Sequence, residues 1–306
     1  MQKTFRRGIF DRYDGWRVRN VDTFFSVAPF ILRTRIDSQC FFEETIPIEH
    51  LESFIRKQKD TMPDITFMHV IIAAMVRMFS QRPYLNRFIV WNKIYARNSI
   101  SLSLAIKRSM TDRGEETIIK PEFEPTDTLA DIVRRVAEAV EQNKMENANN
   151  DTDKIARMLG YMPAFLMRFV VWFLRSLDNV GKLPRAIQSA SPFHSSMFLT
   201  NLGSLGIGPI YHHLYEFGTV SVFAAMGNKT RMHTVTETGE REVRRFIGLK
   251  FVTDERICDG YYYATSMKLL RRLLLNPEVL LTPPETVAVD DGVAKPRIDT
   301  IQLSGK

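Results

Sequence analysis

The strongest constraint on the fold is an almost wholly apolar run at residues 64–80, which lies between Pro63 and Pro83. A run of roughly 17 residues is at the lower limit for a transmembrane helix. However, His69 and Arg77 fall within it, and the flanking prolines suit a helix whose ends are fixed inside a globular protein. We therefore expect a buried core helix, with a membrane span as the less favoured alternative.

Strand and helix patterns are interspersed along the rest of the chain. Alternating apolar residues indicate strands, whereas apolar residues three and four positions apart indicate amphipathic helices. The strand candidates are residues 39–48, 88–95, 100–106, 196–201, 219–226 and 242–253, and the helix candidates are residues 48–59, 127–144, 162–177 and 261–275. This mixture predicts an α+β fold with a mixed-sheet sandwich rather than a doubly wound parallel sheet.

A single large domain accounts for most of the chain. We expect it to span residues 1–281, with a helical insertion near residues 155–185. Thr128 and Asp131 resemble a capping box at the start of the clearest helix. Pro283 and Pro284 open a segment with little periodicity, so residues 282–306 are expected to form a mobile or loosely docked tail.

The helix candidate at residues 162–177 has an unusual composition. Its polar residues include Arg168 and Arg175, two turns apart on one narrow face, and most of the others are apolar or aromatic. One interpretation is a helix buried between subunits or against the core, which is the simpler of the two. The other is a peripheral membrane anchor, whose apolar side enters the bilayer while the arginines meet the headgroups.

Composition adds weaker constraints. The chain has 42 Lys and Arg against 35 Asp and Glu, a net charge of +7, which suits an anionic partner without selecting one. Cys40 and Cys258 are the only cysteines and form no CxxC motif, and no apolar secretory segment follows the N-terminus. A reducing cytoplasm is therefore the simplest location. The sequence has no GxxxxGKS/T, HExxH or GxSxG motif.

Two segments of the C-terminal half carry the pattern that points to a chemistry. The first, residues 196–206, contains Thr-Asn-Leu-Gly at positions 200–203. The second, residues 254–260, reads Asp-Glu-Arg-Ile-Cys-Asp-Gly and precedes a predicted helix that ends in Leu-Asn-Pro-Glu-Val-Leu-Leu at residues 275–281. An Asp-Gly pair before a helix is commonly a turn with an N-cap, so the second segment alone indicates no function.

Together, the two segments resemble the catalytic domain of the dihydrolipoamide acyltransferases of 2-oxo-acid dehydrogenase complexes and, more distantly, chloramphenicol acetyltransferase. In the first family a DHRxxDG motif precedes a helix with a Leu-x-x-Pro-x-x-Leu-Leu ending, and a TxSNLG-like strand lies upstream. The residues that match are Thr200 (in place of serine), Asn201, Gly203, Asp254, Arg256, Asp259 and Gly260. The resemblance covers residues 15–281 and is strongest from Ser195 onward. No lipoyl or peripheral subunit-binding domain is recognisable, so a free-standing protein is expected.

The resemblance implies the CoA-dependent acyltransferase fold and attack of a thiol or hydroxyl on an acyl-CoA thioester. In that family a histidine removes the acceptor's proton, and a serine or threonine hydroxyl, here Thr200, stabilises the oxyanion. Asp259 matches an aspartate that holds the motif loop by pairing with an N-terminal arginine, for which Arg19 is preferred over Arg17. Asn201, Arg256 and Gly260 would support the site.

The resemblance also implies partners. It predicts a homotrimer with active sites between subunits, and acyl-CoA as a co-substrate rather than a tightly bound cofactor. It predicts neither a metal ion nor a nucleic-acid partner.

The chain departs from the family at the catalytic position, where Glu255 replaces the histidine. A carboxylate can act as a general base, and burial can raise its pKa toward neutrality. Two functions stay open: an acyltransferase that uses Glu255 as its base, and an inactive relative that serves as a CoA- or acyl-binding, scaffold or regulatory protein.

Overall fold

A mixed β-sheet forms the centre of the molecule. The computed structural model describes residues 11–107, 116–148 and 161–293 of the chain. Within them, seven strands form one sheet in the order β2-β10-β9-β8-β5-β6, with β7 also paired to β5. The strands are β2 (Gln39–Pro47), β5 (Ile100–Lys107), β6 (Glu116–Ile119), β7 (Glu122–Phe123), β8 (Met197–Asn201), β9 (Val222–Val235) and β10 (Arg241–Asp254). Strand β8 is parallel to β5 and β9, and the other pairs are antiparallel.

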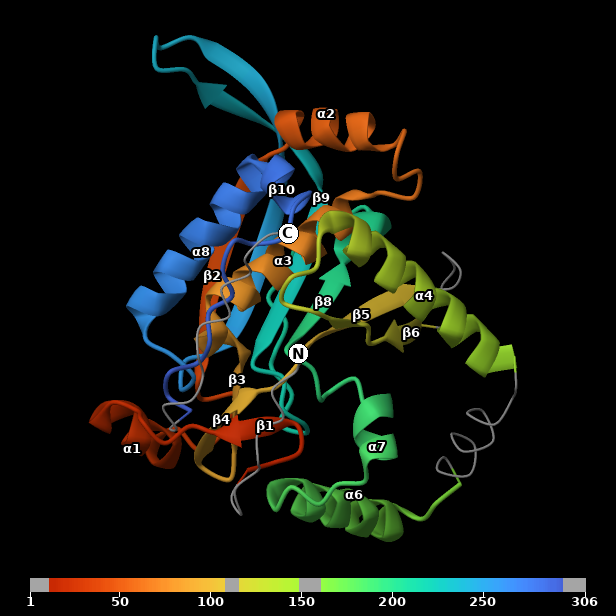
Figure 1. Ribbon diagram of the computed structural model, residues 1–306, viewed down its shortest axis with the longest axis vertical. Helices are drawn as coiled ribbons and strands as arrows, with labels where there is room; N and C mark the ends of the chain where they lie inside the picture. The colour runs from red at the N-terminus through yellow and green to blue at the C-terminus, as the bar shows by residue number, and fades with distance from the viewer. Residues whose placement is uncertain (1–10, 108–115, 149–160, 294–306) are drawn as a thin grey trace.

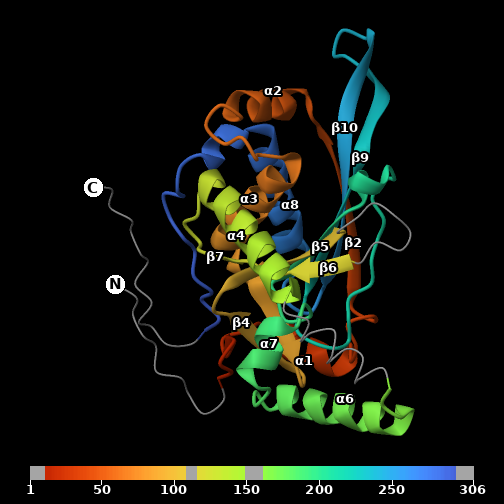
Figure 2. The ribbon, with the colours of Figure 1, turned by 90° about the vertical axis from the view of Figure 1, so that its right-hand side faces the viewer.

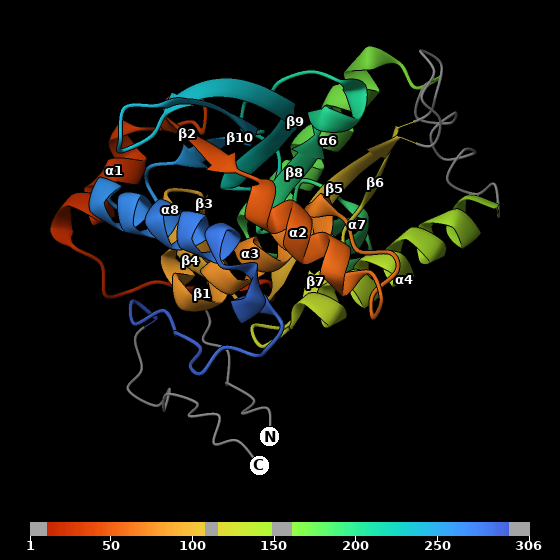
Figure 3. The ribbon, with the colours of Figure 1, turned by 90° about the horizontal axis from the view of Figure 1, so that it is seen from above.

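Four helices cover one face of this sheet (Figure 2). They are α2 (Glu49–Gln58), α3 (Phe67–Gln81), α4 (Leu129–Ala148) and α8 (Gly260–Leu275). Seen from above, α3 and α8 lie side by side over the strands (Figure 3). At the start of α4, Thr128 Oγ1 donates to Asp131 Oδ2 at 2.7 Å and Thr128 N donates to the same oxygen at 3.0 Å. The predicted capping box is therefore confirmed.

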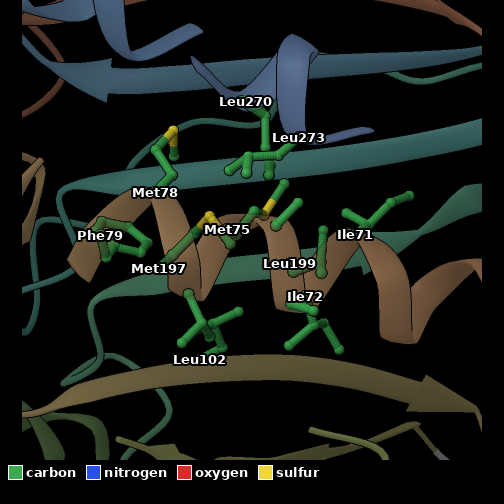
Figure 4. Packing of buried hydrophobic residues seen from close by; sticks show 14 of the residues in the cluster. Ile71, Ile72, Met75, Met78, Phe79, Leu102, Met197, Leu199, Leu270 and Leu273 are labelled. Carbon is green, nitrogen blue, oxygen red and sulfur yellow. The ribbon is translucent and has the colours of Figure 1, made fainter. Parts of the chain in front are cut away.

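Helix α3 is the core helix that the apolar run predicts. Its side chains lie between α8 and the strands, where they meet Leu270 and Leu273 of α8, Leu102 of β5 and Leu199 of β8 (Figure 4). The one guanidinium in the run, that of Arg77, donates to the carbonyls of Val279 and Thr282. None of the helices among the described residues is long and apolar enough to cross a membrane.

A second, three-stranded sheet has the order β1-β4-β3 and corrects one prediction. Residues 88–95, predicted as a single strand, contain two strands, β3 (Arg87–Val90) and β4 (Lys93–Arg97), which form a hairpin. The turn between them places Trp91 and Asn92 at φ values of 48° and 58°. The usual glycine signal for such a turn is absent, which explains the error. Strand β1 (Gly15–Arg17) completes this sheet.

Three helices lie away from the layered core. Helix α1 (Thr23–Ile31) has no sequence signal because Pro29 lies inside it, and α7 (Arg185–Ala190) is short. Helix α6 (Ala164–Asn179) matches the predicted helix at residues 162–177. Three short 3-10 helices span Pro83–Asn86, Leu202–Leu205 and Pro277–Leu280. Figures 1 and 2 both place α1 and α6 at one end of the molecule and the β9–β10 hairpin at the other.

The segment after α8 is bound more firmly than expected. The buried Arg87 guanidinium binds both carboxylate oxygens of Asp290 at 2.6 Å, and Gly292 O accepts hydrogen bonds from Arg19 N and Asn20 N. The expectation of a mobile or loosely docked tail is therefore wrong for residues 282–293, because a non-local ion pair fixes them. Residues 294–306 lie outside the described part of the chain.

Candidate functional site

A buried ion pair shapes the turn that follows β10. The carboxylate of Asp254 is fully buried and accepts from Arg256 Nε at 2.8 Å and from Arg256 Nη2 at 2.6 Å. Arg256 Nη1 also donates to Leu32 O, and Tyr263 OH donates to the Asp254 carbonyl. Two residues of the family-like motif thus bind each other, and they attach the turn to the end of α1 and to α8.

Glu255 lies between these two buried residues, but its own side chain is only half-buried. Its backbone N–H donates to Ser38 O at 2.9 Å, which holds the residue beside the start of the edge strand β2. Cys40 of that strand directs its thiol toward the carboxylate, with 3.2 Å between Sγ and Oε2. Among the described residues, the other oxygen, Oε1, accepts no hydrogen bond. Cys40 therefore holds one carboxylate oxygen of Glu255, and the other oxygen can accept a hydrogen bond from a ligand.

Cys40 is the neighbour of Glu255 that sequence reasoning missed. Burial raises the pKa of the Cys40 thiol to about 11, and the Glu255 carboxylate acts in the same direction. At neutral pH the thiol therefore keeps its proton and donates it in the hydrogen bond. Cys40 and Cys258 are both free thiols. The only available signal was the position of Cys40 in a predicted strand. That position does not reveal that the turn with Glu255 lies beside this strand in the folded protein.

Asp259 and Gly260 form the start of α8. Asp259 Oδ1 accepts from Tyr262 N at 2.7 Å and is the N-cap of the helix. The predicted partner, Arg19, instead binds Asp11, with 3.4 Å between Nη2 and Oδ1, and Arg17 N also donates to Asp11. Among the described residues, Asp259 therefore forms no ion pair with Arg19 or Arg17, and its carboxylate caps the helix instead.

Thr200 and Asn201 end strand β8. Leu199 belongs to the main core and Phe198 to a smaller cluster on the opposite face, so alternation places Thr200 on the face away from α3 and α8. Asn201 Oδ1 accepts from Ser204 N and caps the following 3-10 helix. A Cβ on Gly203 would stand 2.5 Å from the Gly227 carbonyl oxygen, so glycine is needed there for the turn to pack on β9.

Strand register separates Thr200 from Glu255. Thr200 is level with Ala225 of β9, which is level with Lys250 of β10. Asp254 lies four residues further along β10, and β10 is two strands away from β8. With rises of about 3.3 Å and strand spacings of about 4.8 Å, the Cα atoms of Thr200 and Asp254 are roughly 16 Å apart. One small reacting group cannot contact both Glu255 and Thr200 within a single chain.

The six histidines have their contacts away from Glu255. His194 is buried beside Asp178, with 3.2 Å between Nε2 and Oδ2. His212 stacks on Phe223 with ring centroids 4.4 Å apart, and its Nε2 is buried without a partner among the described residues. The others are His50 beside Glu278, His69 in the cap of α3, His213 beside Tyr215 and His233 in the β9–β10 hairpin. No cluster of metal-ligating side chains is found in the described ranges.

The strand order, the layer of helices on one face and the position of the turn at residues 254–260 define the fold class. It is the α+β, mixed-sheet fold of CoA-dependent acyltransferases, as the sequence predicts. No family model matches the sequence, and no curated protein does.

Solved structures of dihydrolipoamide acetyltransferases carry this fold. A probable enzyme from Listeria monocytogenes is 14% identical with a TM-score of 0.53, covering 82% of this chain and 88% of that one. The cubic core of a pyruvate dehydrogenase multienzyme complex is 15% identical with a TM-score of 0.53, covering 84% and 88%. The Azotobacter vinelandii enzyme is 15% identical with a TM-score of 0.52, covering 79% and 84%.

Proposed function

We propose that the protein transfers an acyl group between CoA, or a carried thioester, and a thiol or hydroxyl acceptor. The observation that carries this proposal is the state of Glu255. It is a half-exposed carboxylate in a turn fixed by the buried Asp254–Arg256 pair, and a thiol already donates to one of its oxygens. An acceptor thiol or hydroxyl at the other oxygen would meet the same hydrogen-bond geometry.

The proposed reaction uses Glu255 as a proton carrier. Oε1 accepts the acceptor's proton as its sulfur or oxygen attacks the thioester carbonyl, which gives a tetrahedral oxyanion. The oxyanion then re-forms the carbonyl, the bond to the CoA sulfur breaks, and the leaving thiolate takes the proton back from Glu255. Acyl-CoA is thus a co-substrate.

The spacing within the fold supports the motif assignment. In the Azotobacter vinelandii enzyme, a serine, a histidine and an asparagine have been investigated for roles in the catalytic mechanism, and the asparagine follows the histidine by four residues. Glu255 and Asp259 have the same spacing here. A carboxylate is intrinsically a weaker base than an imidazole, so a histidine at position 255 should serve at least as well as a base.

Two copies are needed for Thr200 to take part. The separation of roughly 16 Å between Thr200 and Asp254 requires that the hydroxyl which stabilises the oxyanion comes from another subunit. We propose a homotrimer in which Thr200 of one copy faces Glu255 of the next. The free thiols of Cys40 and Cys258 suit a reducing compartment such as the cytoplasm.

The test is CoA release from acyl-CoA with dihydrolipoamide and with a panel of other thiol and hydroxyl acceptors. Glu255→Gln should lower kcat/KM by about 10²–10⁴-fold because it removes the base but keeps the shape. Glu255→His should retain turnover or raise it. The matched control is Glu138→Gln, which removes an exposed carboxylate of α4. Unchanged turnover in Glu255→Gln would exclude Glu255 as the base.

A second candidate is a non-catalytic protein that binds CoA or acyl groups. It is favoured by the contacts of the histidines, none of which lies against Glu255 within the described residues. Binding of CoA to the wild type without release from any acyl-CoA, together with an inactive Glu255→His variant, would establish this candidate and overturn acyl transfer.

A further inference from the structure

Helix α6 exposes an aromatic face to solvent. Phe165 is 75% exposed and Trp172 is 61% exposed, and Phe169 and Phe173 are exposed on the same side. The ring centroids of Phe169 and Trp172 are 5.8 Å apart, and those of Phe169 and Phe173 are 6.3 Å apart. Spacings of three, four and eight residues place these rings on one helix face. They form one continuous apolar surface rather than scattered exposed residues.

The helix is fastened to the molecule through its opposite side. Asp178 is its only fully buried residue. Its Oδ1 accepts from Arg12 Nη2 at 2.7 Å, and its Oδ2 lies 3.2 Å from His194 Nε2. Because an ionised carboxylate can only accept, His194 carries its proton on Nε2. This buried network fixes the rotation of α6, so the outward direction of the aromatic face is a property of the fold.

A second apolar helix lies at the same end of the molecule (Figures 1 and 2). In α1, Phe24 is 68% exposed, Ile31 is 70% exposed, and Phe30 is also exposed. Glu216 links the two helices. Its Oε1 accepts from the backbone N–H of Arg35, just after α1, at 2.6 Å, and its Oε2 lies 3.8 Å from Arg175 of α6.

The charges of this end are predominantly positive. Asp178, buried and paired, is the only carboxylate in residues 161–190, while the exposed cations there are Arg168, Arg175, Lys182 and Arg185. Residues 23–36 contain no carboxylate and add the exposed Arg33. At the opposite end, the β9–β10 hairpin mixes both signs, with Glu237, Glu240 and Glu242 beside Arg241 and Arg244. Among the described residues, the α1–α6 end therefore combines exposed aromatic rings with an excess of positive charge, although Glu216 lies beside Arg175, and Asp22 and Asp37 flank residues 23–36.

We infer that the end formed by α1 and α6 docks on the surface of an anionic lipid bilayer. In this arrangement α6 lies in the interface, its rings enter the boundary between headgroups and acyl chains, and its cations contact acidic headgroups. A surface of exposed aromatic rings bordered by cations fits such a bilayer, because it complements both the apolar interior and the negative headgroups. The inference does not depend on acyl transfer, since it uses none of the residues of the Glu255 site.

Co-flotation with vesicles tests the docking. The probes are phosphatidylcholine vesicles with and without phosphatidylglycerol. Wild type should float with the mixed vesicles and do so much less at high salt or with phosphatidylcholine alone. Phe169→Ser with Trp172→Ser should weaken binding at least about tenfold, because two large apolar side chains no longer enter the interface. The matched control is Val235→Ser with Val243→Ser, which changes two exposed apolar side chains of the distant hairpin and should bind as wild type does.

Two further variants separate the contributions of charge and contact. Arg168→Glu with Lys182→Glu keeps Arg175 and its contact to Glu216, and should bind at least about tenfold more weakly only when phosphatidylglycerol is present. Trp172→Phe should keep the binding but lose the blue shift of tryptophan emission that vesicles cause in wild type. Retention of that shift would show that Trp172 does not enter the bilayer.

Three results would overturn the inference. The first is absence of wild-type flotation with mixed vesicles. The second is equal flotation of wild type and Phe169→Ser with Trp172→Ser. The third is self-association that this double variant abolishes in the absence of vesicle binding, because a second copy of the chain would then cover the aromatic face. Circular dichroism and thermal unfolding of each variant confirm that it is folded.

Discussion

The turn at residues 254–260 and helix α6 are both held by a buried carboxylate–guanidinium pair, but the two pairs differ in sequence separation. In the turn, Asp254 and Arg256 are two residues apart and bind each other through two hydrogen bonds. At α6, Arg12 bridges Asp14 and Asp178, which come from opposite halves of the chain. The first pair is part of a local motif, whereas the second exists only once the fold has formed.

This difference decides what each pair can control. The local pair shapes one turn and so sets the direction of Glu255. The distant pair joins the N-terminal segment to α6 and His194, so it sets how a whole helix is presented. Both leave the side chains of interest accessible, because Glu255 is only half-buried and the aromatic face of α6 is exposed. Breaking each pair in turn should separate these two roles.

Replacing Arg12 should have the largest effect on stability. Arg12→Met leaves Asp14 and Asp178 buried without their cation, and such a loss typically costs about 3–5 kcal/mol. Urea denaturation should show this loss, and hydrogen exchange should rise in α6 more than in α8. Equal protection of α6 in wild type and variant would contradict its anchoring through Asp178.

Replacing Asp254 should lower the free energy of unfolding nearly as much as replacing Arg12 does. Its effect on local structure should be confined to the turn at residues 254–260. Asp254→Ala leaves the buried Arg256 without a carboxylate, although the Leu32 carbonyl still accepts from Nη1. We expect a loss of about 3 kcal/mol in urea denaturation, with hydrogen exchange raised around residues 254–260 and unchanged in α6. Raised exchange in α6 would show that the two regions are coupled.

Acid should remove part of the stability that Asp178 contributes, a smaller loss than that expected for Arg12→Met or Asp254→Ala. Burial alone would raise the pKa of Asp178, but the hydrogen bond from His194 and the charge of Arg12 lower it from 3.8 to about 2. The folded protein therefore binds this proton less readily than the unfolded chain. The resulting stability, about 2 kcal/mol, is present above pH 4 and is lost as the pH falls toward 2. In Asp178→Asn, this part of the pH dependence of the unfolding free energy should disappear.

Gly260→Ala should have the smallest effect on stability and a separate effect on activity. A Cβ at this position meets no atom within 4 Å, and alanine is favoured over glycine in a helix by up to about 1 kcal/mol. We expect slightly raised stability. If substrate approaches Glu255 across this helix start, CoA release should nevertheless fall. Asp259→Ala is the comparison, because it should cost about 1 kcal/mol through loss of the N-cap.

Local patterns predicted much of the fold. The apolar run gave α3, and the Thr128–Asp131 capping box gave the start of α4. Each of these signals lies within one element, so no knowledge of tertiary contacts is needed. Helix α1 was missed because Pro29 within it normally indicates a break.

For the candidate site, sequence patterns located the local elements but not the contacts between them. The motif identified the turn at residues 254–260 and the end of β8, and the structure shows why Asp254, Arg256 and Gly203 occupy their positions. The partners of the turn were not predictable, because Cys40 meets Glu255 across 215 residues of chain. The expected Arg19–Asp259 pair is not found among the described contacts, because Arg19 instead binds Asp11, eight residues away in the sequence.

The ion pair between Arg87 and Asp290 has a consequence for any shortened version of the protein. Arg87 also reaches the turn, with Nη1 at 3.4 Å from the Ile257 carbonyl oxygen. A chain cut after residue 281 would lose Asp290 and leave this guanidinium buried beside the turn without its counter-ion. A shortened chain intended for expression should therefore extend through residue 293. Asp290 neutralises the guanidinium that contacts the turn carrying Glu255.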